Sequence, residues 1–169
     1  MSGDQHFTTA DGCRIAYRID GPVDRPVLML SNSIATNLHM WDRSVAALGR
    51  SFRLLRYDTR GHGGSDAPAG PYSMDRLGRD VVELLDFLDI DRAHFLGLSL
   101  GGFIGQWLGV FAPNRIDRLI LSNTAPYLAA ELHFDDQIHA VLAASDMDAI
   151  ADGFMRNWFP ATMLAAPNE

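Results

Sequence analysis

The sequence predicts an α/β fold with a mainly parallel sheet that carries helices on both of its faces. Short, continuously apolar segments, typical of buried strands, alternate along the chain with segments whose apolar residues recur at helical spacing. Residues 97–101 read Gly-Leu-Ser-Leu-Gly and lie between the apolar segment 93–96 and one such helical segment. This order of strand, Gly-x-Ser-x-Gly turn and helix predicts that the side chain of Ser99 projects from a tight turn, as a nucleophile requires.

The composition is that of a globular domain. Of the 169 residues, 47% are hydrophobic and 21% are charged. The 21 acidic and 14 basic residues give a net charge of −7, which argues against binding to the phosphates of nucleic acid. Cys13 is the single cysteine and has no intrachain disulfide partner, which suits a reducing cytoplasm. The first residues form no signal segment and no apolar run is long enough to span a membrane, so we expect a cytoplasmic protein.

The first half of the chain alternates strands and helices. Its predicted strands are residues 14–19, 27–30 and 52–57. The first alternates polar and apolar side chains, which predicts a half-exposed strand near a sheet edge, whereas the second is continuously apolar and should be buried. Helical spacing predicts helices over residues 41–48 and 74–88, and Ser73 is placed to cap the second of them.

The helix after Ser99 carries Gly101, Gly105 and Gly109 in one row, each four residues from the next. A glycine in a helix interior costs about 1 kcal/mol relative to alanine. The row therefore indicates that this face of the helix lies very close against its neighbours. Residues 116–121 are apolar at most positions and predict a further buried strand.

The alternation of strands and helices stops after Pro126. Two apolar stripes follow at helical spacing, over residues 134–142 and 150–158, with no strand between them. Two such helices predict a cap over the sheet. We therefore expect a core domain over residues 1–126 and an incomplete helical cap over residues 127–169.

Three segments resemble the α/β-hydrolase superfamily, whose fold has three layers, with a sheet between two layers of helices. They are residues 30–42 (Leu-Ser-Asn-Ser-Ile-Ala-Thr-Asn-Leu-His-Met-Trp-Asp), residues 57–66 with an Arg-Gly-His-Gly-x-Ser loop, and residues 97–109 continuing to Ser-Asn-Thr-Ala at 122–125. The first and third segments are similar to the 3-oxoadipate enol-lactonases in particular. Related arylesterases and homoserine-lactone hydrolases share much of the same pattern. The resemblance runs from about Phe7 to Pro160 and so covers nearly the whole chain.

The resemblance implies a role for individual residues. Ser99 matches the nucleophile, and the backbone N–H groups of Leu100 and Ile34 match the two donors that stabilise the oxyanion. Ser33, Trp41 and Trp158 are candidates for lining the substrate pocket, with packing in the core as the alternative for both tryptophans. Neither a metal nor another cofactor is expected, because the chain shows no metal-ligand spacing and no dinucleotide glycine pattern.

The general base is not found in this sequence. In the superfamily the acid and the histidine follow the nucleophile, and the resemblance places both beyond the cap. The chain reaches Glu169, and its last strand candidate is residues 116–121. We therefore expect the C-terminal strands of the sheet to be missing from this chain, and a complementing C-terminal segment to carry the Asp and the His.

The remaining histidines and Asn123 are assigned no part in proton transfer. His133 and His139 fall on or near the first cap helix, and Asn123 is an amide where some relatives carry an acid. The resemblance implies that His62 braces turns below the site. His39 is a candidate for lining the pocket, with a structural role as the alternative.

The sequence thus predicts an enzyme that hydrolyses a small lactone or carboxylic ester through an acyl-enzyme on Ser99, with 3-oxoadipate enol-lactone as the favoured substrate. Aryl esters and acyl-homoserine lactones are the alternative substrates. A non-catalytic, hydrolase-like module that binds a ligand is the alternative of a different class. Residues 1–169 alone are expected to be inactive, with the apolar strand 118–121 left as an unpaired edge.

Overall fold

The computed structural model describes residues 4–127, 134–146 and 148–165. The chain divides into two compact units, Met1–Pro126 and Tyr127–Glu169. None of the described helices is long and apolar enough to cross a membrane.

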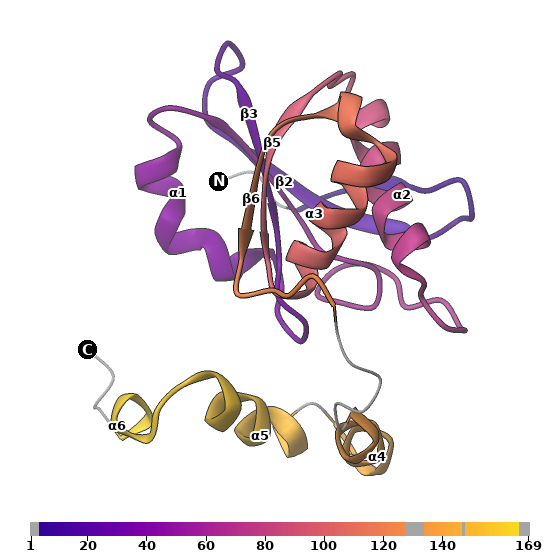
Figure 1. The fold of residues 1–169 in the computed structure, drawn as a ribbon, viewed down its shortest axis with the longest axis vertical. Helices are drawn as coiled ribbons and strands as arrows, with labels where there is room; N and C mark the ends of the chain where they lie inside the picture. The colour runs from indigo at the N-terminus through magenta and orange to yellow at the C-terminus, as the bar shows by residue number, and fades with distance from the viewer. Residues whose placement is uncertain (1–3, 128–133, 147, 166–169) are drawn as a thin grey trace. The chain divides into compact units, whose positions relative to one another are not determined.

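The first unit is built on a six-stranded sheet in the order β1-β2-β4-β3-β5-β6 (Figure 1). The strands are β1 (Gln5–Thr8), β2 (Arg14–Asp20), β3 (Val27–Ser31), β4 (Arg53–Tyr57), β5 (Ala93–Leu98) and β6 (Ile116–Ser122). The pairs β1/β2 and β2/β4 are antiparallel, and β4, β3, β5 and β6 pair in parallel. The predicted mainly parallel α/β sheet is confirmed, and the structure adds β1, which the sequence analysis did not locate.

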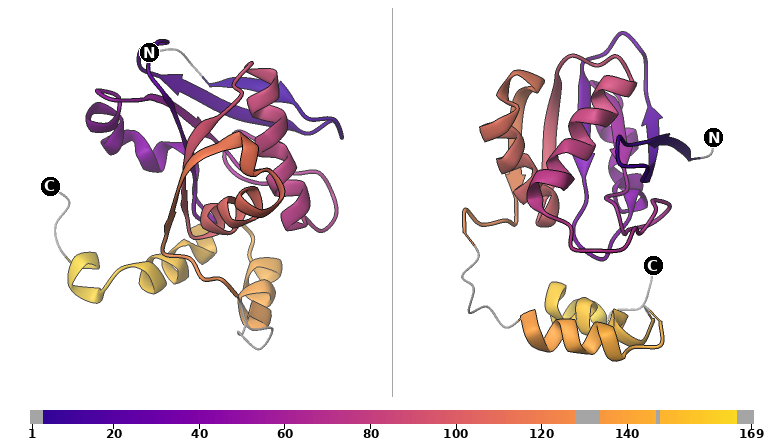
Figure 2. Two further views of the ribbon diagram at one scale, coloured as in Figure 1. Left: turned by 45° about the horizontal axis from the view of Figure 1, so that its top comes forward. Right: turned by 90° about the vertical axis from the view of Figure 1, so that its right-hand side faces the viewer.

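Helices cover both faces of the sheet (Figures 1 and 2). On one face lie the 3₁₀ turn η1 (Leu38–Trp41) and α1 (Asp42–Leu48), and on the other lie α2 (Met74–Phe87) and α3 (Leu100–Phe111). Alternate strand residues supply the two cores, because successive side chains of a strand point to opposite faces. Leu28, Leu30 and Leu54 pack under η1 and α1, whereas Met29, Leu55 and Phe95 belong to the larger core that includes residues of α2 and α3. A second 3₁₀ turn, η2 (Pro113–Arg115), leads into β6.

Both helices predicted for the first half of the chain are confirmed. The Ser73 hydroxyl accepts a hydrogen bond from the Arg76 N–H at 3.1 Å and caps α2, as expected. The half-exposed pattern predicted for β2 is wrong at Ala16, which is fully buried. The loop of residues 58–66 covers it: the Ala16 N–H donates to the Ser65 hydroxyl at 2.9 Å, and its carbonyl accepts from the Asp58 N–H.

The predicted burial of the sixth strand is wrong. Leu119, Ile120 and Leu121 are 37%, 49% and 42% exposed. Among the described residues β6 is the edge of the sheet and pairs only with β5. A continuous apolar run predicts burial from composition alone, but burial also requires a neighbour, and the described residues provide one on one side only.

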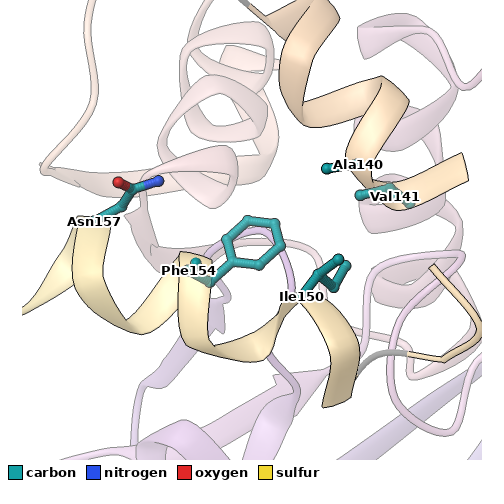
Figure 3. A pocket seen from close by; sticks show the side chains of 6 residues that line it. Ala140, Val141, Ile150, Phe154 and Asn157 are labelled. Atoms are coloured by element: carbon teal, nitrogen blue, oxygen red, sulfur yellow. The ribbon is translucent and has the colours of Figure 1, made fainter. Parts of the chain in front are cut away.

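The second unit is helical. It contains α4 (Phe134–Ala143), α5 (Asp148–Trp158) and the short α6 (Ala161–Leu164), so both helices predicted after Pro126 are confirmed and one is added. A small hollow between α4 and α5 is lined by Ala140, Val141, Ile150, Gly153, Phe154 and Asn157 (Figure 3). Ile150 and Phe154 point from α5 toward α4, whereas Ile138 and Leu142 of the apolar stripe predicted for α4 are exposed.

Candidate active site

Ser99 stands on the turn between β5 and α3 in a strained backbone conformation. Its φ is 52° and its ψ is −110°, a region that residues with a side chain rarely adopt. The Ser99 N–H donates to the Ser122 carbonyl at 2.9 Å, and its own carbonyl accepts from the Gly102 N–H at 2.9 Å. The end of β6 and the first turn of α3 therefore hold the strained turn, called the elbow below (residues 97–101), from two sides.

The two glycines of the elbow are required by close backbone approach. A Cβ atom on Gly97 would lie 2.1 Å from the Gly101 carbonyl oxygen, and a Cβ atom on Gly101 would lie 2.3 Å from the Ser31 carbonyl oxygen. Both distances are too short for any side chain. The Gly-x-Ser-x-Gly pattern is thus a packing requirement of β3, β5 and α3 at this point.

Two groups of the elbow are free to meet a ligand. Within the described part of the chain, neither the hydroxyl of Ser99 nor the backbone N–H of Leu100 has a hydrogen-bond partner. The N–H lies in the first turn of α3, where the helix dipole and unpaired N–H groups favour negative charge. The predicted nucleophile and one predicted oxyanion donor are therefore adjacent in the chain.

The loop after β3, residues 32–37, is called the oxyanion loop below. Ile34 is 47% exposed, and no described residue accepts a hydrogen bond from its backbone N–H. Ser33 is buried and its carbonyl accepts from the Thr36 hydroxyl at 2.7 Å. Ala35 has a φ of 58°, so the loop is strained next to the predicted donor.

A backbone hydrogen bond joins the oxyanion loop to the elbow. The Gly101 N–H donates to the Asn32 carbonyl at 3.0 Å. The Asn32 side chain is buried: its Oδ1 accepts from the indole Nε1–H of Trp41 at 2.7 Å, and its Nδ2 donates to the Tyr57 carbonyl at 2.9 Å. Trp41 was predicted from the sequence as a pocket residue, whereas Asn32 was not predicted. Its backbone and side chain together have four hydrogen-bond partners, at Trp41, Tyr57, Asp58 and Gly101.

The loop after β4 braces the same region. The buried carboxylate of Asp58 accepts from the Leu38 N–H at 2.6 Å and from the Gly64 N–H at 2.8 Å. Burial raises the pKa of the Asp58 carboxyl, and these two N–H donors partly oppose that rise. Burial likewise raises the pKa of the Tyr57 phenol, which lies 2.8 Å from the Ser31 hydroxyl. Both side chains are buried within the first unit.

No described histidine of the first unit reaches Ser99. His62 Nδ1 lies 3.2 Å from the Arg60 carbonyl, and His39 Nδ1 lies 3.0 Å from an Asp42 carboxylate oxygen. Of the remaining first-unit histidines, His6 lies 3.2 Å from the Gly64 carbonyl and His94 lies 3.4 Å from the Asp117 carboxylate. Asn123 has a φ of 46° and its amide oxygen accepts from the Ser122 hydroxyl.

The sequence-predicted residues of the second unit are placed within that unit only. His139 is an exposed residue of α4, and His133 lies outside the described residues. Trp158 is 39% exposed at the end of α5, and its ring packs against Phe154 with centroids 5.3 Å apart. In the parts of the chain that the structure describes, no three His, Cys, Asp or Glu side chains gather in a way that could hold a metal ion.

Comparison with known proteins agrees with the fold. The alpha/beta hydrolase fold family matches residues 26–162. The 3-oxoadipate enol-lactonase 2 of Acinetobacter baylyi is 47% identical over 117 residues, which cover 69% of this chain and 44% of that protein. The crystal structure of a hydrolase from Pseudomonas aeruginosa is 55% identical with a TM-score of 0.92, covering 97% of this chain and 63% of that one.

The enol-lactonase from Burkholderia xenovorans LB400 is a further structural neighbour. Its sequence is 42% identical, its TM-score is 0.87, and the match covers 95% of this chain and 62% of that one. The chain therefore spans less than two thirds of the length of each of these three relatives.

Proposed function

The chain belongs to the alpha/beta hydrolase fold family, and we propose that it forms the nucleophile-bearing part of a serine hydrolase that cleaves a small lactone or carboxylic ester. The strained elbow carries the proposal, because its Ser99 hydroxyl and a neighbouring N–H in the first turn of α3 are both unpaired among the described residues. Similarity to two enol-lactonases favours 3-oxoadipate enol-lactone as the substrate.

The proposed reaction uses Ser99 as nucleophile. Its Oγ attacks the carbonyl carbon of the lactone while a histidine takes its proton. The negative oxygen of the tetrahedral intermediate accepts hydrogen bonds from the backbone N–H groups of Leu100 and Ile34. One donor of this kind is typically worth about 2.7–4 kcal/mol of transition-state stabilisation. The ring C–O bond then breaks, the histidine returns the proton to the leaving oxygen, and water releases the acid from Ser99.

We propose that the histidine and the Asp that orients it come from a complementing segment outside residues 1–169. The support is that the described histidines of the first unit make their contacts elsewhere and none bonds to Ser99. The second unit is proposed to be the cap, with Trp158 and Ser33 lining the substrate pocket. No cofactor is required by this chemistry, and Cys13, as the single cysteine, suits a cytoplasmic location.

The test is a joined protein, in which the part of the Pseudomonas aeruginosa hydrolase that this chain does not match is appended after Glu169. We expect the joined protein to react with a fluorophosphonate at Ser99 and to hydrolyse lactones, including in the presence of EDTA. Ser99→Ala should abolish both, whereas Ser145→Ala, a change at an exposed hydroxyl of the second unit, should leave both unchanged. Labelling that survives Ser99→Ala, or activity lost with EDTA, would contradict the mechanism.

The substrate is tested by comparing specificity constants. We expect an enol-lactone that carries a carboxylate tail to have a higher kcat/KM than p-nitrophenyl acetate or an acyl-homoserine lactone. The reverse order would assign the protein to the arylesterase or homoserine-lactone group. Binding of the lactone without labelling or turnover would instead favour the non-catalytic ligand-binding module.

A further inference from the structure

Asn32 has a single possible orientation at the junction of the oxyanion loop and the elbow. Its amide oxygen faces the indole N–H of Trp41 at 2.7 Å, and its amide nitrogen faces the Tyr57 carbonyl at 2.9 Å. An indole N–H only donates and a carbonyl only accepts, so exchanging the amide atoms would lose both bonds. The fixed side chain also fixes the direction of the Asn32 backbone carbonyl, and this backbone carbonyl accepts from the Gly101 N–H of the elbow at 3.0 Å.

Asp58 fixes the other end of the oxyanion loop. Its carboxylate is buried and, within the described residues, forms no ion pair with a cationic side chain. It accepts instead from two backbone N–H groups, those of Leu38 at 2.6 Å and Gly64 at 2.8 Å, and more weakly from the Asn32 Nδ2 at 3.5 Å. A buried charge is costly unless it is hydrogen-bonded. Here those bonds tie the turn that follows the oxyanion loop to the loop after β4.

Inside the oxyanion loop, the bond from the Thr36 hydroxyl to the Ser33 carbonyl holds the shape of the loop but does not fix its position relative to the elbow. Ile34 is 47% exposed and its backbone N–H is unbonded among the described residues. Ala35 holds a positive φ of 58°. The position of the Ile34 N–H relative to the Leu100 N–H is therefore set by the hydrogen bonds that hold the loop at its two ends.

We propose that Trp41, Asn32 and Asp58 are positioning residues that hold the Ile34 and Leu100 N–H groups toward the same oxyanion. This inference rests on the proposed function and deepens it. Trp41 holds the start of the oxyanion loop through Asn32. Asp58 holds the turn after the end of the loop through the Leu38 N–H, and it also accepts from Asn32 Nδ2 at 3.5 Å. Preorganised donors of this type act only when their supporting residues are rigid.

The variants Trp41→Phe and Asp58→Asn test the proposal in the joined protein. Trp41→Phe keeps an aromatic ring and removes the N–H. Asp58→Asn leaves one acceptor oxygen in place of two, of which one now accepts from Leu38 and Asn32 and the other from Gly64. Since loss of a whole oxyanion donor costs about 100- to 1,000-fold in rate, we expect each variant to lower kcat by about 10- to 100-fold with KM nearly unchanged. The double variant should lose less than the product of the two, because both act through one loop.

Asp66→Asn is the matched control. Asp66 lies in the same 58–66 loop and also accepts from a backbone N–H, that of Arg14 at 3.0 Å, but it makes no contact with the oxyanion loop. We expect kcat within about twofold of the parent for this variant, consistent with a surface substitution. Equal loss of kcat in Asp66→Asn and Asp58→Asn, or an unchanged kcat in Trp41→Phe, would overturn the proposal.

Hydrogen exchange at the Gly101 N–H tests the positioning role without using activity. We expect Trp41→Phe to speed exchange at Gly101 by about tenfold, because its acceptor on Asn32 loses its fixed direction, while exchange in the middle of α2 stays unchanged. If the joined parent protein neither labels nor turns over, the proposed function fails, and faster exchange at Gly101 still supports the anchoring. Unchanged exchange at Gly101 in both variants would overturn the inference even in an active enzyme.

Discussion

The two ends of α3 differ in how closely they approach the rest of the first unit. At the start of the helix, a Cβ atom on Gly101 would lie 2.3 Å from the Ser31 backbone oxygen, and nothing except glycine fits. At the end of the helix, a Cβ atom on Gly109 would meet only a methyl group of Leu119 at 3.3 Å. Val110 and Phe111, which follow, are 69% and 68% exposed.

This difference shows which contacts the candidate site depends on. The first turn of α3 is held by backbone atoms of β3 and β6, which cannot move without moving the sheet. The last turn is held by side chains, which can change rotamer. The glycines of this row therefore differ in the space that they leave for a side chain. Gly101, beside Ser99, leaves none, whereas Gly109, at the end of the helix, is expected to tolerate one.

Gly101→Ala is expected to have the largest effect. Overpacking a close-packed core costs about 1–3 kcal/mol and occasionally more, and we expect at least the upper end of this range because the contact is with backbone. The variant should also push Asn32 away from the elbow and abolish labelling of Ser99. Urea unfolding and fluorophosphonate labelling of the joined protein measure the two effects. Normal labelling with a small change in stability would show that β3 can move. The first turn of α3 would then be no more tightly packed than its last turn.

The sequence was sufficient where the cause of a structure is local. The cap of α2 at Ser73 follows from a hydroxyl three residues before an N–H, and the elbow follows from Gly-x-Ser-x-Gly between a strand and a helix. The strand β1 was not located because three of its four residues are exposed and its strand state depends on pairing with β2. The exposure of Leu119 to Leu121 follows from the position of β6 at the edge of the described sheet, which was expected from the resemblance and not from the side chains themselves.

The supports of the site could not be read from the sequence. Asn32, Trp41 and Asp58 are separated by up to 26 positions in the chain and meet only because β3 and β4 are neighbours in the sheet. Asp58 lies just before the Arg-Gly-His-Gly segment, in which only His62 was assigned a role from the sequence. The single available signal was an acidic residue placed directly after a buried apolar strand, where its carboxylate must find donors.

Leu108→Ala and Val110→Ala compare two neighbours on α3 and are expected to differ strongly. Leu108 is fully buried and Val110 is 69% exposed. Truncating a buried leucine to alanine costs about 2–5 kcal/mol, whereas an exposed substitution changes stability by about 0.5 kcal/mol or less. Urea unfolding of the joined protein gives both values. A cost above 1 kcal/mol for Val110→Ala would mean that the appended segment covers the end of the helix. The last turn of α3 would then be more closely packed than the described residues indicate.

Gly109→Ala is expected to have the smallest effect, and one of opposite sign. Alanine is favoured over glycine in a helix interior by about 1 kcal/mol, chiefly because the unfolded chain loses freedom. The new methyl group would meet Leu119 Cδ2 at 3.3 Å, and Leu119 is 37% exposed, so its side chain has room to turn away. We therefore expect a net gain of about 0.5–1 kcal/mol, seen as a rise in Tm of about 1–4 °C for a protein of this size. A loss of stability would show that Leu119 is held in place, and thus that β6 is as rigid at the end of α3 as β3 is at its start.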